Sequence, residues 1–253
     1  ERLNSVADTL DTSRLFPWPA LLSPAIPPLP FAASFLHQPG FFARIRPAQQ
    51  ANVLKKAASL QPPPGQPEPG CLRFAPGFDL TTVFEPDREV VVQDLQSQHT
   101  LDILLTHHHQ YTKPLRIWDC CAASGGKSIL AYDLLEGKVE LTVSDIRSNI
   151  LRNLAARFER AGIRNYRSAV CDLEQAPPPL PGGSFDIIIC DAPCTGSGTW
   201  GRTPEQLYSF DPGVLSRYHA RQLSIAQHAL PKLRTGGLLI YITCSVFTPE
   251  NEE

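Results

Sequence analysis

The chain contains no methionine in 253 residues, and no apolar stretch approaches the ~20 residues that a membrane-spanning helix requires. Its start also lacks the charged-then-apolar pattern of a secretion signal. We therefore expect a globular protein of the cytoplasm. A natural chain of this length would ordinarily contain several methionines, so their absence indicates a fragment, or a sequence from which modified methionines are missing. The ending Glu250-Asn251-Glu252-Glu253 is consistent with truncation.

The seven cysteines include no C-x-x-C pair, which is the spacing typical of zinc sites and redox motifs. Because their number is odd as well, we expect neither a disulfide framework nor a bound metal. The net charge of −2 gives no overall attraction to a polyanion, although nucleic-acid enzymes often confine basic residues to one face. A hydrophobic content of 42 % is enough to build a sizeable core in one or two domains.

Composition divides the chain into three parts. Residues 1–30 form an N-terminal segment, and we expect its proline-rich stretch, Phe16 to Pro30, to run over the surface as a connector without a helix. Residues 31–93 predict a small α+β domain, and residues 94–253 predict the main domain. The elements expected in the small domain are helices at Phe31–His37 and Gln49–Leu60 and strands at Phe41–Ile45, Cys71–Phe74 and Glu89–Val92.

In the main domain a helical stretch at Ser97–His109 precedes a regular alternation of strands and helices. Strands are expected at Leu115–Cys120, Val139–Ser144, Tyr166–Val170, Phe185–Cys190 and Leu238–Thr243, with helices from Lys127, at Ser148–Ala161 and at Val214–Leu233. Such alternation predicts an α/β fold with a Rossmann-like, doubly wound, mostly parallel sheet.

A turn of small residues, Asp119 to Ser128, follows the first strand and leads into a helix. It is not a nucleoside triphosphate loop, because the required first glycine is replaced by Cys121, and it lacks the three spaced glycines of a dinucleotide site. An adenosine-type ligand fits better, with Asp145 accepting hydrogen bonds from ribose hydroxyls or, alternatively, capping the next helix. Asp172, after the third strand, is placed to reach the adenine end or to cap a helix.

Two cysteines follow buried strands at the same edge of the predicted sheet. Asp191-Ala192-Pro193-Cys194 follows one apolar strand, and Thr243-Cys244-Ser245 follows another. Since ligands of such sheets bind beyond the carboxyl ends of the strands, two thiols there suggest covalent chemistry. A buried cysteine is ordinarily a small apolar residue. We interpret Cys71, Cys171 and Cys190 in that way, and Cys120 and Cys121 as packing and backbone groups of the turn.

Three segments, Asp119 to Lys127, Asp191 to Cys194 and Thr243 to Ser245, together resemble the Sun/Nop2 family of RNA cytosine-5 methyltransferases. The resemblance covers the chain from about Phe41 onward. Val92 to Gln98 and Pro249 to Glu252 are similar to two further family segments, whereas Ser124 stands where members usually have proline. The resemblance implies a class I methyltransferase domain behind a small domain like an RNA-recognition fold. It also implies S-adenosylmethionine as methyl donor and cytosine of ribosomal or transfer RNA as acceptor.

The resemblance assigns four catalytic residues. Cys244 is the nucleophile that adds to carbon 6 of cytosine, and Cys194 assists loss of the carbon 5 proton and release of the product. Asp191, protonated or sharing a proton, hydrogen-bonds the ring nitrogen, while Lys127 favours a thiolate. The turn and the resemblance together assign cofactor binding to Cys121, Ala122, Ala123, Ser124, Gly125, Gly126, Lys127, Asp145, Arg147, Asp172 and Asp191.

Basic residues at Arg44, Arg46, Lys55 and Lys56 predict an RNA-facing surface, with an ordinary charged face as the alternative. The run His107-His108-His109 is not a metal site, because adjacent helical residues point about 100° apart. Two other functions stay open: a methyltransferase acting on uracil or DNA, and a non-catalytic assembly factor that binds the cofactor and RNA. We assume a monomer.

Overall fold

The computed structural model describes residues 11–107, 113–175, 180 and 183–253. They form two compact units, each taken by itself below. The sheet unit consists of Gly40–Asp191 and Ala226–Ile242. The loop unit consists of the described residues up to Pro39, together with Ala192–Ile225 and Thr243–Glu253. The division does not follow the boundaries predicted from the sequence, which remain a prediction.

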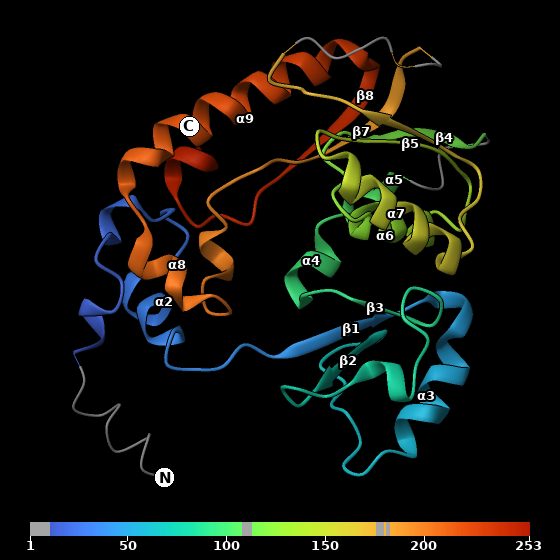
Figure 1. Cartoon of the computed structure of the whole chain (residues 1–253), viewed down its shortest axis with the longest axis horizontal. Coiled ribbons are helices and arrows are strands. Elements are labelled where there is room, and N and C mark those ends of the chain that lie inside the picture. The colour runs from blue at the N-terminus through green and yellow to red at the C-terminus, as the bar shows by residue number, and fades with distance from the viewer. Residues whose placement is uncertain (1–10, 108–112, 176–179, 181–182) are drawn as a thin grey trace. The chain divides into compact units, whose positions relative to one another are not determined.

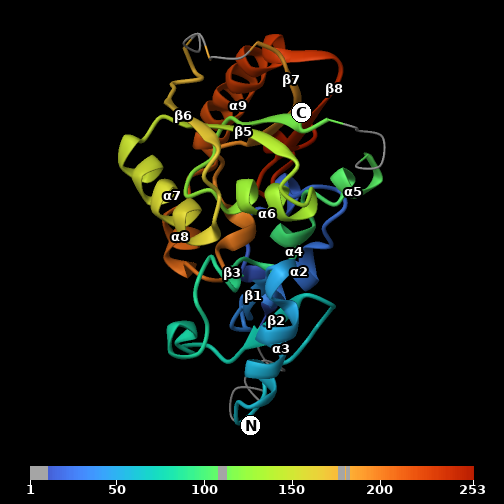
Figure 2. The ribbon, with the colours of Figure 1, turned by 90° about the vertical axis from the view of Figure 1, so that its right-hand side faces the viewer.

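Five parallel strands form the main sheet of the sheet unit, in the order β6-β5-β4-β7-β8. Their bounds are Leu115–Asp119 (β4), Val139–Asp145 (β5), Tyr166–Val170 (β6), Phe185–Asp191 (β7) and Leu233–Ile242 (β8). All neighbouring pairs are parallel, which confirms the predicted α/β fold. Helices α6 (Gly126–Leu134) and α7 (Ser148–Ala161) lie on the same side of this sheet in Figures 1 and 2.

The core of the sheet unit lies between that side of the sheet and the two helices. Alternate strand residues such as Ile117, Val143 and Ile189 are fully buried and pack with Ile129 of α6 and Leu154 of α7. Alternation places every second side chain of a strand on one face, and a period of 3.6 residues gives α7 one apolar side. Burial of these aliphatic side chains positions the carboxyl ends of β4 and β7 side by side.

A second, antiparallel sheet in the same unit has the strand order β2-β1-β3. Its strands are Phe41–Ile45 (β1), Cys71–Phe74 (β2) and Val90–Val92 (β3), and α3 (Gln50–Ala58) packs on it through Val53 and Ala57. The three strands predicted for this sheet are therefore correct to within one residue, whereas in the main sheet β8 begins at Leu233 instead of the predicted Leu238.

The single helix predicted over Ser97–His109 is wrong for its described part, which forms α4 (Leu95–His99) and α5 (Ile103–His107). The chain turns between them because Leu101 and Leu104 are both buried in the core. His108 and His109 lie outside the described residues.

In the loop unit the proline-rich stretch is not an exposed connector. Phe16 and Leu22 are buried and pack with Trp200 and Phe247, and Leu22 forms a β-bridge with Phe247. Helix α2 (Pro28–Ser34) begins within this stretch, which corrects the expectation of no helix. Proline is tolerated in the first turn of a helix because the amides there have no intrahelical acceptor.

The loop unit also contains α8 (Pro204–Ser209), and α9 (Leu215–Ala229) continues from it into the sheet unit at Ile225. Short 3-10 helices occur at Thr12–Arg14, Pro19–Leu21, Pro47–Gln49, Leu80–Thr82, Ser197–Thr199, Pro212–Val214, Leu230–Lys232 and Thr248–Glu250. None of the helices in the described residues has the length and apolar character needed to cross a membrane.

Candidate active site

The first group of site residues lies where β4 and β7 end. The strand order changes direction between these strands, and ligands of open α/β sheets bind at such a point. The turn after β4 brings the chain to Gly125, which has a left-handed backbone (φ +84°), and α6 begins at Gly126. A Cβ on Gly125 would lie 2.8 Å from Phe158, so glycine is needed there.

Asp119, which the sequence analysis did not single out, ends β4 and is almost fully buried. Ser128 donates a 2.6 Å hydrogen bond to its Oδ2 atom, while the buried Oδ1 atom has no hydrogen-bond partner among the described residues. Burial raises the pKa of Asp119 to about 7. An orphaned acceptor beside a small-residue turn fits a ligand that brings its own N–H donor. The signal in the sequence was its place as the last residue of a buried strand.

Asp145, at the end of β5, accepts hydrogen bonds from the Ala123 amide at 3.0 Å and from Arg147 at 2.9 to 3.0 Å. Burial opposes its charged form, but the bonds from Arg147 outweigh that effect and lower the pKa of Asp145. This geometry brings Ala123, Asp145 and Arg147 together. The carboxylate accepts a hydrogen bond from the amide of Arg147, the N-cap residue of α7, and this helix has no side-chain capping hydrogen bond, so Asp145 does not cap it.

Lys127, in the first turn of α6, forms an ion pair with Asp191 at the end of β7, with Nζ and Oδ2 at 2.6 Å. The Asp191 side chain is 31 % exposed, so the buried carboxyl of this region is Asp119 instead. In the same turn, the carbonyl and hydroxyl oxygens of Ser124 accept hydrogen bonds from Arg157. Asp172 accepts one from the Glu174 amide in a turn.

The second group lies in the loop unit, where the sulfurs of Cys194 and Cys244 are 3.3 Å apart. Cys244 is exposed and Cys194 is half-buried. The hydrogen bond with Cys244, together with burial, raises the pKa of Cys194 well above its ordinary value. The Gly198 amide donates to the Cys244 carbonyl at 2.8 Å, and a Cβ on Gly198 would lie 2.8 Å from the same oxygen. Because their sulfurs are within hydrogen-bond distance, the two thiols form a pair suited to sharing one proton.

Glu250 joins the two thiol-bearing loops and was also missed as a site residue. Its buried carboxylate accepts hydrogen bonds from the amide and hydroxyl of Thr195, from the Ser245 hydroxyl and from Gln222. Thr195 follows Cys194 and Ser245 follows Cys244, so one carboxylate holds both neighbours. The motif Pro249 to Glu252 was the available signal.

The three remaining cysteine interpretations differ in outcome. Cys71 and Cys171 are buried as single thiols. Cys190 is buried too, but it lies beside Cys120 and Cys121. Hydrogen bonds from these two thiols lower the pKa of Cys190.

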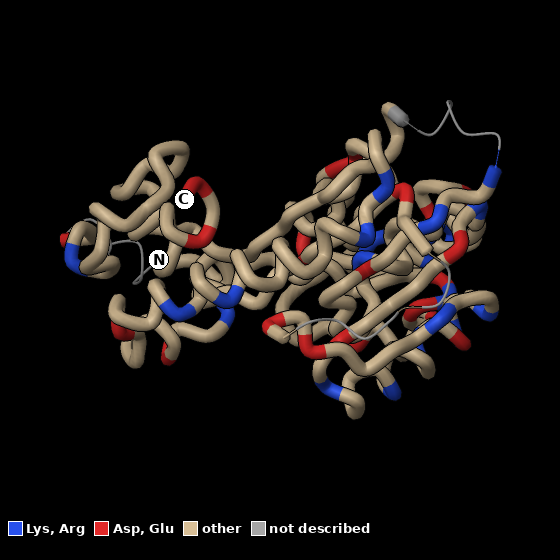
Figure 3. The backbone as a smooth tube through the Cα atoms, turned by 90° about the horizontal axis from the view of Figure 1, so that it is seen from above, with Lys and Arg blue, Asp and Glu red and all other residues tan. Residues whose placement is uncertain are grey.

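The proposed basic surface is wrong for Arg44 and Arg46. Both are buried and bind Asp133 at 2.7 and 2.6 Å. Lys56 pairs with Glu89 at 2.7 Å, and only Lys55 is exposed as expected. Figure 3 shows Lys and Arg positions interspersed with Asp and Glu along the backbone.

A parallel sheet in this order, with a small-residue turn at its switch point, defines the Rossmann-like fold of class I methyltransferases. A sequence profile described as 16S rRNA methyltransferase RsmB/F matches residues 103–253. The chain belongs to this family, which confirms the resemblance to Sun/Nop2 proteins.

Two relatives illustrate the match. A probable ribosomal RNA small subunit methyltransferase B of Bacillus subtilis is 28 % identical over 81 % of this chain and 45 % of its own length. A 28S rRNA (cytosine-C(5))-methyltransferase of Mus musculus is 30 % identical over 54 % of this chain and 18 % of its own. The chain thus spans about half the length of the bacterial relative and a smaller share of the length of the mouse protein.

Solved structures agree on the fold. The crystal structure of PH0851 superimposes with a TM-score of 0.74 at 23 % identity, over 87 % of this chain and 51 % of that one. NSun6 from Pyrococcus horikoshii, solved with SFG, gives a TM-score of 0.56 at 30 % identity, over 66 % of this chain and 41 % of its own.

Proposed function

We propose that this chain transfers a methyl group from S-adenosylmethionine to carbon 5 of cytosine in RNA, through a covalent adduct on Cys244. The observation that carries the proposal is the pair of sulfurs 3.3 Å apart, with the exposed thiol on Cys244. Membership in the family supports the reaction class, and the relatives' names favour ribosomal RNA as the substrate. A cytoplasmic location and a division at residues 31–93 and 94–253 stay part of the proposal.

Cys244 acts as the nucleophile, and Cys194 acts as the group that transfers protons. Cys244 as a thiolate bonds to carbon 6 of cytosine, which makes carbon 5 nucleophilic. The pKa of Cys194 is raised while Cys244 is its hydrogen-bond partner, so Cys194 starts as the thiol that donates to the thiolate. Once the Cys244 sulfur is bonded to carbon 6, it no longer accepts the Cys194 proton, and this cause of the raised Cys194 pKa is removed. Cys194 then loses its proton to solvent. After carbon 5 has received the methyl group, the Cys194 thiolate takes the carbon 5 proton, the electrons of that bond restore the double bond between carbons 5 and 6, and Cys244 leaves carbon 6 as a thiolate.

The sheet unit holds the groups that would bind the cofactor, which supplies an electrophilic methyl group when bound. The orphaned Oδ1 atom of Asp119 would accept from its ammonium group. Asp145 would bind ribose hydroxyls after Arg147 releases one carboxylate oxygen, and Gly125 and Gly126 give close backbone approach. Asp191, protonated or sharing a proton with its partner Lys127, would donate a hydrogen bond to the ring nitrogen of cytosine. The neighbour solved with SFG, an analogue of S-adenosylmethionine, supports this choice of cofactor.

The test is transfer of radiolabelled methyl to RNA that lacks the modification, followed by digestion to nucleosides. Label in 5-methylcytosine should be lost in Cys244→Ala and retained in Cys171→Ala, a matched variant of a buried thiol. Cys194→Ala should accumulate a covalent RNA adduct on denaturing gels, and Cys244→Ala should form none. Label in 5-methyluridine or DNA, or tight RNA and cofactor binding without transfer, would refute the proposal in favour of the other functions.

A further inference from the structure

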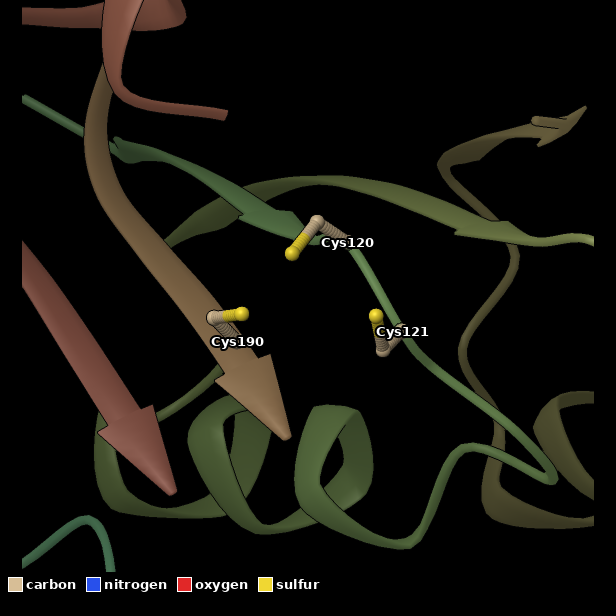
Figure 4. Close-up of side chains that lie close together, drawn as sticks. All are labelled: Cys120, Cys121 and Cys190. Carbon is tan, nitrogen blue, oxygen red and sulfur yellow. The ribbon is translucent and has the colours of Figure 1, made fainter. Parts of the chain in front are cut away.

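Three cysteines of the sheet unit direct their sulfurs at one another. Figure 4 shows the sulfurs of Cys120, Cys121 and Cys190 turned towards a common centre, and all three lie within 4.8 Å of one another. Cys120 and Cys190 are 1 % and 0 % exposed, while Cys121 is partly exposed. The cluster belongs to the sheet unit, whereas the Cys194 and Cys244 pair belongs to the loop unit.

Strand pairing explains why they converge. β4 and β7 are parallel neighbours, and the Cys120 amide donates to the Ile189 carbonyl at 2.9 Å, which places Cys120 beside Cys190. Adjacent side chains of a strand point to opposite faces. Cys121 escapes this rule because β4 ends at Asp119 and the chain bends into the turn. Two vicinal thiols can then face the same neighbour.

We propose that Cys120, Cys121 and Cys190 form a three-thiolate binding site for a soft monovalent cation of the Cu(I) class. Bonds of about 2.3 Å to three sulfurs in a plane need sulfurs about 4 Å apart, and the observed limit of 4.8 Å leaves less than one ångström of adjustment. Sulfur ligands select soft cations. Structural zinc takes four ligands, whereas the group found among the described residues has three. Binding forms three sulfur–metal bonds and releases one proton per thiol to solvent, with no change of oxidation state.

The probe is Cu(I), supplied without oxygen to the full chain in competition with a chromophoric Cu(I) chelator. Cys194→Ser and Cys244→Ser are introduced throughout, because sulfurs 3.3 Å apart would also take up a soft cation. We expect one Cu(I) per chain, with three sulfur neighbours by X-ray absorption. Cys121→Ala and Cys190→Ser should weaken binding by more than about 100-fold. Cys71→Ser and Cys171→Ser, which change buried thiols outside the cluster, should leave it unchanged.

Unchanged Cu(I) affinity in Cys121→Ala and Cys190→Ser would overturn the proposal, and so would a two-coordinate spectrum. Loss of two thiols on treatment with peroxide, without measurable Cu(I) binding, would overturn it too and show a redox pair. Circular dichroism shows whether each variant is folded. If Cys190→Ser does not fold, Cys121→Ala decides the outcome, because its side chain is partly exposed. None of these readouts depends on methyl transfer.

Discussion

At the scale of single residues, Glu250 shows how a buried carboxylate can position groups that it does not touch. Its carboxylate accepts hydrogen bonds from Thr195 and Ser245, which each follow one of the two thiols, and from Gln222. In Glu250→Gln, an amide donor replaces one acceptor oxygen and meets donors from Thr195 or Ser245. Bonds to a charged group contribute about 1.5–3 kcal/mol each, so we expect adduct formation to slow by about 10- to 100-fold.

The measurement is the rate of covalent adduct formation with RNA at saturating substrate. A positioning role lowers this rate while the KM for RNA stays close to that of the wild type. Glu253→Gln is the matched control, since it changes a nearby glutamate whose side chain is exposed. Equal rates in Glu250→Gln and Glu253→Gln would contradict the prediction, and the melting temperature of both variants separates positioning from unfolding.

Asp119 makes the stability of the protein depend on pH. Its folded pKa of about 7 exceeds the ordinary value of 3.8, so between these values the folded state keeps a proton that the unfolded state releases. Stability therefore falls as pH rises from about 4 to 7 and then levels off. One pKa unit corresponds to about 1.4 kcal/mol, so the loss is at most about 4 kcal/mol. Urea unfolding of Asp119→Asn should lack this decline. Parallel profiles for both proteins would show that another group is responsible.

At the scale of elements, Gly125 decides how α6 meets α7. Alanine there would need a left-handed backbone and a Cβ 2.8 Å from Phe158 and 3.0 Å from Leu154. We expect Gly125→Ala to lower the free energy of unfolding by about 2–4 kcal/mol, because strain and overpacking add. Gly126→Ala is the control, since the nearest atom, on Arg157, is 3.9 Å away. Similar losses in both variants, by urea unfolding, would rule out this explanation.

Sequence periodicity predicted the elements well where packing agrees with it. Ser148–Ala161 was predicted to the residue, because its apolar positions repeat with helical spacing and Gly162 ends it in a left-handed conformation. The helix expected at Val214–Leu233 ends at Ala229 instead, and β8 begins at Leu233. Pro212 begins the 3-10 helix that precedes α9, and Pro231 is the second residue of the 3-10 helix Leu230–Lys232 that follows it. α8 was missed because a six-residue helix has too little periodicity to detect.

At the scale of the whole molecule, the two sheets of the sheet unit are joined by buried ion pairs. Arg44 lies in β1 and Arg46 directly follows it, and both bind Asp133 of α6. The side chains of Arg44, Arg46 and Asp133 are 9 %, 10 % and 5 % exposed. Burial lowers the pKa of Arg44 despite the pull of Asp133. Asp87 similarly binds Arg157 and Arg160 of α7. These contacts make residues from both predicted domains part of one unit.

Asp133→Asn tests this connection. Two buried guanidinium groups would lose their shared counter-charge, and Nη2 of Arg44 already lacks a partner among the described residues. We expect a loss of about 3 kcal/mol in the free energy of unfolding. Asp102→Asn removes an exposed partner of His99 and should cost less than about 1 kcal/mol. Equal costs, measured in urea, would mean that the buried pairs contribute no more than a surface pair.

The sequence by itself determined the order of the strands along the chain, the turn after β4, and the two cysteines past β7 and β8. These are local properties: alternation, small residues and apolar runs depend on neighbours a few positions away. Only the tertiary structure decided that Asp119, rather than Asp191, is the buried acid, and that Arg44 and Arg46 face Asp133 instead of solvent. It alone brought Cys190 to Cys120 and Glu250 to both thiol loops. Burial and charge pairing join residues that are remote in sequence, so they depend on how the elements pack.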